Sequence, residues 1–132
     1  MNHLKQKNLL KLIESLNTNK SPGADGIAPK LIKEIAPLIL QPLLYLYNLS
    51  LSTNTFPETL KMAKVISIYK KGERHLLNNY RPISLLSIFS KLLEKVMHKR
   101  LYSYLQSNNI LCRYQFGFRK KNQYRTCSDR CC

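Results

Sequence analysis

Acidic residues are scarce in this sequence. Of its 132 residues, 7 are Asp or Glu and 22 are Lys or Arg, which gives a formal net charge of +15. A charge of this size is costly in self-repulsion and favours a polyanionic partner, most commonly nucleic acid. A basic solvated surface without a partner is the alternative. The few acidic residues are scattered and none forms a pair, so no metal site is expected: Glu14, Asp25, Glu34, Glu58, Glu73, Glu94 and Asp129.

A long apolar run is also missing. The most apolar window, residues 35–51, contains two prolines and two side-chain amides, and it is shorter than a membrane span. We therefore expect a buried helix there and no contact with a membrane. The first seven residues are not followed at once by the apolar stretch of a secretory signal. The expectation is an intracellular protein without a signal peptide, with nucleus and cytoplasm not distinguished.

Cysteine is present but poorly spaced for a metal. Cys131 and Cys132 are adjacent, Cys127 lies just before them, and Cys112 lies in another segment. Structural zinc sites prefer cysteine pairs separated by two to four residues, with a second pair further on. Without a secretory context, free thiols are expected rather than disulfides. The three histidines are isolated in the sequence, and no catalytic role is assigned to them.

One basic segment lies between two apolar runs. Residues 65–69 and 83–86 have the length and the β-branched or aromatic content of strands. The polar segment between them opens with Lys-Lys-Gly and has the composition of a turn. The pattern predicts an antiparallel β-hairpin whose tip and shoulders carry Lys70, Lys71, Arg74 and Arg81. Lysine supplies a mobile point charge and arginine a planar fork, so such a hairpin suits a phosphate chain.

Helical patterns surround this hairpin. An amphipathic helix is predicted from residue 9 to near residue 17. Asp25 is expected to cap a helix that begins near Ile27, with Pro29 in its first turn. Residues 38–51 are apolar on nearly all sides and predict a buried helix that absorbs Pro42 or begins at it.

Two further helices are expected around the hairpin. Thr55 and Glu58 have the spacing of a capping box for a short helix before it. After it, Ser87 is expected to cap a long helix with one apolar face, ending at Asn108 and Asn109. The basic residues of this helix either keep it soluble or contact phosphate: Lys91, Lys95, Lys99 and Arg100. The predicted fold class is α+β, mostly helical with a small antiparallel β-hairpin.

Three sequence blocks carry a family pattern. They read SPGADGIAPKLIKEI, NYRPISLLS and QFGFRKK, in this order. With them, the chain from about Lys20 to Lys121 resembles the start of the reverse transcriptase domain of non-LTR (LINE-type) retrotransposons. The resemblance implies that residues 1–121 form the fingers and the start of the palm of an RNA-directed DNA polymerase. Residues 122–132 depart from the family pattern and are expected to be disordered.

The resemblance also implies roles for individual residues. Lys70 or Lys71 would reach the outer phosphates of an incoming nucleotide, and Arg81 would contact that nucleotide from the neighbouring strand. An ordinary charged turn, and a salt bridge from Arg81 to Glu73, are the respective alternatives. Tyr80 and Phe118 are expected to pack rather than to stack on bases. The block expected against template and incoming base consists of Gln115, Gly117, Phe118 and Arg119.

Catalytic residues are not expected in this chain. The complete family enzyme uses Mg²⁺ held by an aspartate motif and a later Tyr/Phe-Ala-Asp-Asp motif, and neither motif occurs in these 132 residues. We therefore expect a truncated enzyme that is inactive alone, carries no cofactor, and binds an RNA or DNA template-primer and a deoxynucleoside triphosphate weakly. A non-catalytic basic nucleic-acid-binding module and a non-functional transposon relic are the alternatives. The oligomeric state is left open.

Overall fold

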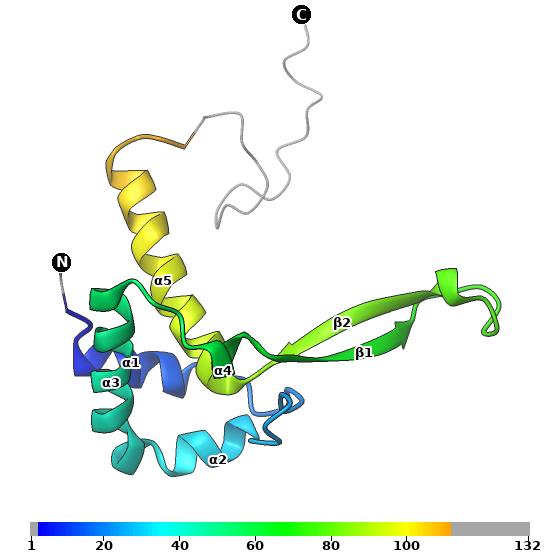
Figure 1. Cartoon of the computed structure of the whole chain (residues 1–132), viewed down its shortest axis with the longest axis horizontal. Helices are drawn as coiled ribbons and strands as arrows, with labels where there is room; N and C mark the ends of the chain where they lie inside the picture. Colours follow the sequence, from blue (N-terminus) through cyan, green and yellow to red (C-terminus); the bar gives the residue numbers. More distant parts are fainter. Residues whose placement is uncertain (1–2, 112–132) are drawn as a thin grey trace, which may run out of the picture. The chain divides into compact units, whose positions relative to one another are not determined.

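The computed structural model describes residues 3–111, and these form a mixed, mostly helical α+β structure (Figure 1). The predicted fold class is confirmed at this level. In chain order the elements are α1 (Gln6–Glu14), α2 (Pro29–Glu34), α3 (Ala36–Thr53), α4 (Glu58–Lys61), β1 (Ala63–Tyr69), the 3-10 helix η1 (Leu77–Asn79), β2 (Tyr80–Leu86) and α5 (Ile88–Ser107). Two compact units divide after Met97, within α5. The second unit contains the rest of α5, and Asn109, in the left-handed region at φ 52°, lies in the turn that ends this helix, as predicted.

The core of the first unit is built from one apolar face of each of its longer helices. Leu9 and Ile13 of α1 are one helical turn apart and are fully buried, and Leu92 and Leu93 of α5 are equally inaccessible. Within residues 3–111, the buried hydrophobic side chains of this core are Leu4, Leu9, Ile13, Leu16, Ile32, Ala36, Leu40, Leu43, Tyr47, Ile88, Leu92, Leu93 and Val96, and Pro29 of α2 is buried as well. The start of α5 is therefore fixed in a core that α1, α2 and α3 supply.

Helix α3 differs from its prediction. Pro42 is accommodated inside the helix, but the expectation of burial on nearly all sides is wrong. Its buried residues fall at spacings of three and four, which is a single stripe. On the other side, Leu38 is 79% exposed and Tyr45 is 68% exposed. Sequence hydropathy does not say on how many sides a helix has neighbours, and here the described residues supply them on one side only.

Two predicted helix caps are wrong. Helix α2 begins at Pro29, and its N-cap Ala28 has no side-chain cap, so Asp25 does not cap it. Helix α4 begins at Glu58 after Pro57 without a side-chain cap, and the hydroxyl of Thr55 donates to the carbonyl of Thr53 instead. In α2, Pro29 stands in the first turn, where its missing N–H leaves one donor fewer to cap. In α4, the N-cap residue is Pro57 itself, which has no side-chain acceptor.

The third predicted cap is confirmed. The N–H of Phe89 donates to Ser87 Oγ at 3.2 Å, at the start of α5. The Ser87 hydroxyl in turn donates to Asp25 Oδ2 at 2.6 Å, while Asp25 Oδ1 accepts the N–H of Ile27 at 3.2 Å. Asp25 thus supports the cap of a helix 62 residues away in sequence.

Gly23 explains why this contact is so close. A Cβ at this position would lie 2.7 Å from the carbonyl carbon and oxygen of Leu86 and 2.7 Å from the nitrogen of Ser87. Real Cβ atoms do not approach backbone atoms so closely, so the position admits only glycine. The loop of residues 21–26 therefore packs directly on the junction where β2 passes into α5.

The predicted hairpin is confirmed and longer than expected. Strands β1 and β2 pair antiparallel in one register from Ala63 opposite Leu86 to Tyr69 opposite Tyr80 (Figure 1). The N–H of Lys70 donates to the carbonyl of Asn79 at 2.8 Å, which marks a hydrogen-bonded pair. Such pairs alternate with non-hydrogen-bonded pairs, so Pro82 falls in a non-hydrogen-bonded pair and its nitrogen faces away from β1. Proline is tolerated there because no ladder hydrogen bond is lost.

Candidate nucleic-acid interface

The register places two of the predicted binding residues on one face of the hairpin. Arg81 lies directly opposite Ile68, and side chains directly opposite one another point to the same face. Lys70 follows the last residue of β1, but its N–H donates to the carbonyl of Asn79 and so continues the pairing. Alternation from Ile68 then puts Lys70 on that face as well. Diagonal neighbours of this kind are about 7–8 Å apart, within reach of one phosphate group by two long side chains. The face with Lys70 and Arg81 is called the cationic face below.

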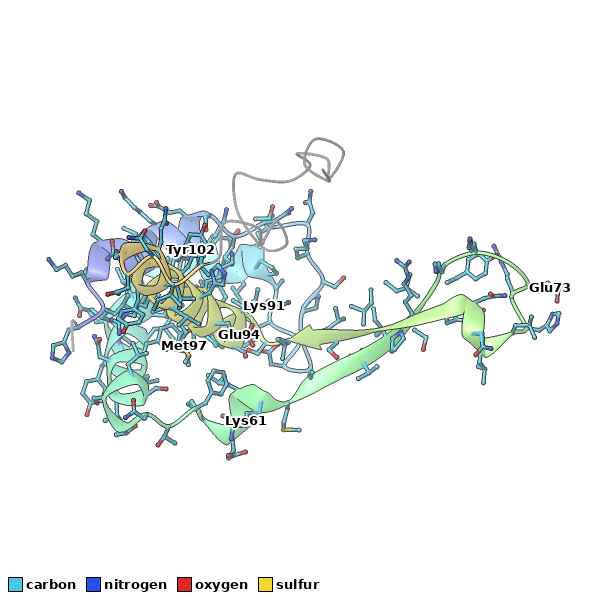
Figure 2. The ribbon with its side chains drawn as sticks, turned by 90° about the horizontal axis from the view of Figure 1, so that it is seen from above. Lys61, Glu73, Lys91, Glu94, Met97 and Tyr102 are labelled. Atoms are coloured by element: carbon cyan, nitrogen blue, oxygen red, sulfur yellow. The ribbon has the colours of Figure 1, made fainter. Side chains whose placement is uncertain are left out.

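The cations of the hairpin lack acidic partners in the part of the chain that the structure describes. Glu73, the nearest acidic residue in sequence, lies at the turn between the strands (Figure 2). Its Oε2 lies 3.1 Å from His75 Nε2, so the expected alternative of a salt bridge to Arg81 is not what forms. Lys70, Lys71 and Arg81 are all exposed. Three cationic side chains are therefore available to an anion.

The opposite face is aromatic. The rings of Tyr69 and Tyr80 meet edge to face with centroids 5.7 Å apart. The guanidinium carbon of Arg74 lies 5.5 Å from the centroid of the Tyr69 ring, within cation–π range. Tyr80 therefore packs within the hairpin, as expected. Arg74, the fourth cation predicted on the hairpin, lies against this aromatic ring.

Three consecutive carbonyls of the tip loop are held by side chains. Tyr69 Oη donates to the carbonyl of Gly72, and Asn79 Nδ2 donates to the carbonyl of Glu73 at 2.8 Å. Tyr80 Oη donates to the carbonyl of Arg74 at 2.8 Å. Gly72 has a φ of +94°, in the region that favours glycine. The loop is thus a fixed structure rather than an open polar turn. Sequence analysis missed this, although the tyrosine at each strand end was visible.

The remaining predicted site residues cannot be placed. Gln115, Gly117, Phe118 and Arg119 lie outside the described residues, as do the four cysteines and the segment 122–132. The lysines of α5 are placed in part: Lys95 is exposed and Lys91 is partly buried, one turn before it. Within residues 3–111, neither of these two lysines forms an ion pair.

The carboxylates do not gather. Among residues 3–111, no three His, Asp or Glu side chains lie close enough together to hold a metal ion. The Mg²⁺ that the family pattern implies therefore has no fitting donor set among these described residues. Within the same residues, no helix is both long and apolar enough to cross a membrane.

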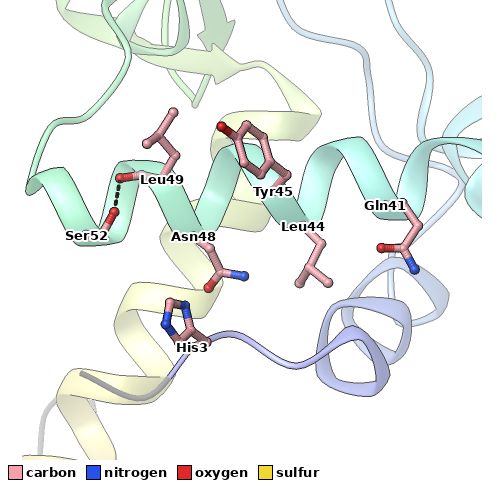
Figure 3. Close-up of a pocket in the computed structure, with 7 residues that line it drawn as sticks. All are labelled: His3, Gln41, Leu44, Tyr45, Asn48, Leu49 and Ser52. Atoms are coloured by element: carbon pink, nitrogen blue, oxygen red, sulfur yellow. Dashed lines mark hydrogen bonds between the residues drawn. The ribbon is translucent and has the colours of Figure 1, made fainter.

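A separate hollow lies on α3, and no residue of the hairpin lines it. It has a volume of about 370 Å³ and is lined mainly by side chains of α3 together with His3 (Figure 3). Asn48 fixes the segment beside it, because Oδ1 accepts the N–H of Leu4 at 2.7 Å and Nδ2 donates to its carbonyl at 3.3 Å. The lining contains no Lys, Arg, Asp or Glu. The hollow therefore does not share the chemistry of the hairpin.

Comparison of this sequence with known proteins finds several similar ones. No family model matches the chain. It is 36% identical over 118 residues to "Probable RNA-directed DNA polymerase from transposon BS" of Drosophila melanogaster, covering 89% of this chain and 13% of that protein. It is 33% identical over 109 residues to the RNA-directed DNA polymerase from mobile element jockey of the same species, covering 82% and 12%. A Pol polyprotein from the type-1 retrotransposable element R1 of Bradysia coprophila is 32% identical over 80% of this chain. The chain spans about an eighth of the length of such relatives.

Proposed function

Because this chain belongs by sequence to the RNA-directed DNA polymerases of non-LTR (LINE-type) retrotransposons, we propose that it supplies the nucleotide- and template-contacting fingers of such a polymerase. The proposal rests on the pairing of Arg81 with Ile68 and its continuation at Lys70, which together put Lys70 and Arg81 on one face. Both residues are exposed, and Glu73 is turned to His75. The ligands proposed are the phosphates of an RNA or DNA strand and of a deoxynucleoside triphosphate.

The chemistry of the cationic face fits a polyphosphate. The Arg81 guanidinium offers parallel N–H donors that match two oxygens of one phosphate. Lys70 offers a compact charge on a flexible stem, which can follow a neighbouring phosphate. Lys71 adds a further exposed charge at the tip. The paired strands hold the backbone of these residues in place, so only side-chain freedom is lost on binding.

The site is proposed to bind rather than to catalyse. Nucleotide addition needs divalent metal ions held by carboxylates, and the described carboxylates do not converge. We propose that this segment alone does not extend a primer. A primer-extension assay with Mg²⁺ tests this: no product is expected, and template-dependent synthesis by the purified chain contradicts it. The assay also separates a binding module from an active polymerase.

A charge-matched pair of variants tests the binding site. Lys70→Ala/Arg81→Ala removes two charges from the cationic face, and Lys7→Ala/Lys11→Ala removes two exposed charges from α1. Binding of a labelled single-stranded RNA and of a nucleoside triphosphate is followed by fluorescence anisotropy and calorimetry. The hairpin variant is expected to bind about tenfold or more weakly than the α1 variant, since each close charge pair contributes on the order of 1 kcal/mol even in water. Equal weakening in both variants contradicts a localised site.

A further inference from the structure

The hydrogen bonds that hold the carbonyls of the tip loop also determine where its backbone N–H groups point. The carbonyls of Gly72, Glu73 and Arg74 are turned toward the hydrogen-bond donors of Tyr69, Asn79 and Tyr80. The residues described contain no cis peptide bond. In a trans peptide the C=O of one residue and the N–H of the next point in opposite directions. The N–H groups of Glu73, Arg74 and His75 are therefore directed away from those donors.

These three N–H groups are available to a ligand. The backbone hydrogen bonds of the tip begin at the N–H of Lys70 and resume at the N–H of Leu76, which donates to the carbonyl of Glu73 at 3.3 Å. Between them, residues 73–75 have no N–H hydrogen bond within the described residues, and all three are exposed. Successive free N–H groups in a turn form a concave site for an anion.

Some charged side chains near the loop favour a bound anion and one opposes it. Lys71 lies beside the loop in sequence and is exposed. The Glu73 carboxylate opposes an anion, although its Oε2 is directed toward His75 Nε2 at 3.1 Å. Arg74 lies on the aromatic face, over Tyr69. The backbone donors thus stand apart from Arg81, which points from the cationic face.

We propose that the N–H groups of Glu73, Arg74 and His75 form a second phosphate site at the hairpin tip, separate from Lys70 and Arg81. This inference rests on the proposed function of the hairpin as a contact to nucleic acid or nucleotide. The site takes one phosphate group, from either a strand backbone or a triphosphate. Tyr80 is a positioning residue of this site, because its hydroxyl fixes the peptide that carries the N–H of His75.

Amide NMR of the full ¹⁵N-labelled chain tests the site residue by residue. Inorganic phosphate, a nucleoside triphosphate and a short single-stranded RNA are added in separate titrations. Saturating shifts at the amides of residues 73–75 are expected, and the probe that saturates at the lowest concentration identifies the source of the phosphate. Shifts confined to residues 68–70 and 81 overturn the tip site but leave the proposed function standing. No shift in either group overturns both.

Neutral substitutions give the matched test. Tyr80→Phe keeps the ring and all charges, and is expected to weaken saturation of the tip amides about fivefold, the effect of about one hydrogen bond. Tyr45→Phe, at an exposed position of α3, is expected to change nothing. Glu73→Gln is expected to strengthen tip binding about two- to fivefold by removing the opposing charge, whereas Glu58→Gln on α4 is not. Tip amides that respond identically in Tyr80→Phe and Tyr45→Phe contradict the positioning role, and a Glu73→Gln variant that binds more weakly contradicts the site.

Discussion

The contact between Ser87 and Asp25 gives a prediction with a magnitude that can be worked out. Replacing Ser87 by Ala removes the cap to the N–H of Phe89 and the donation to Asp25. Loss of an N-cap costs about 1 kcal/mol. A hydrogen bond to a charged group contributes roughly 1.5–3 kcal/mol when shielded, and the exposure of Asp25 reduces this to about 1 kcal/mol. The expected loss in the free energy of unfolding is therefore about 2 kcal/mol.

The melting temperature measures this loss. For a domain of about 100 residues, 1 kcal/mol corresponds to roughly 4–8 °C, so Ser87→Ala should melt about 8 °C or more below the parent. Ser21→Ala, at an exposed position of the loop that contains Asp25, is the control and should melt within about 2 °C of the parent. Asp25→Ala should cost about 1 kcal/mol alone and less in the Ser87→Ala background, because the two residues share one hydrogen bond. Strictly additive losses, or a Ser87→Ala protein as stable as Ser21→Ala, would refute the reasoning.

The remaining predictions concern four other positions. Gly23→Ala should lower the free energy of unfolding by about 2–3 kcal/mol through overpacking against backbone atoms, and Gly26→Ala, with open space but a φ of +70°, by about 1 kcal/mol; thermal melts compare the two. Tyr47 is buried and donates to the Phe89 carbonyl, and burial raises the pKa of its hydroxyl above the ordinary 10.0. The contribution of the Tyr47 hydroxyl to the free energy of unfolding is then fully present below pH 10 and falls as the pH rises further, since only the unfolded state ionises readily. In urea melts, the Tyr47→Phe protein should lack this fall in stability above pH 10. Arg81→Lys keeps the charge but loses the planar fork, so calorimetry should show triphosphate binding about fivefold weaker than in the parent and tighter than in Arg81→Ala.

Local sequence patterns predicted the elements well where one physical signal dominates. The two β-branched runs around a Lys-Lys-Gly turn gave the hairpin and its pairing. The last helix and its serine cap were also correct, but the predicted apolar face is buried only as far as Val96. Its further members Met97, Leu101 and Tyr104 are exposed, because the described residues do not cover that part of the helix. The hairpin, the helix and its cap depend on residues close in sequence, so single-sequence reasoning reaches them. Strand ends extended beyond the prediction, because pairing across the hairpin continues through Tyr80 and Arg81 once the register is set.

Features that depend on distant contacts were not predicted. Asp25 was expected to cap its own helix, and its partner is Ser87, far along the chain. Nothing in the local sequence around Asp25 indicates that partner. The one-sided burial of α3 is of the same kind, because hydropathy reports what a helix can bury and not which neighbours it has.

The candidate site likewise combines features that the local sequence predicts with features that it does not. Composition and family pattern single out Lys70 and Arg81 as the proposed phosphate-binding residues, but their common face needs the register. The fixed tip loop depends on three side-chain hydrogen bonds whose geometry no residue pattern specifies.

The salt dependence of RNA binding tests the central claim most directly. The slope of log affinity against log salt concentration counts released counterions, at about 0.7 per phosphate contact for a single strand. Lys70→Ala/Arg81→Ala should therefore lower the magnitude of the slope by about 1.4 relative to the parent, and Lys7→Ala/Lys11→Ala should leave it unchanged. Equal slopes in the hairpin variant and the parent would show that phosphate is not held by the cationic face.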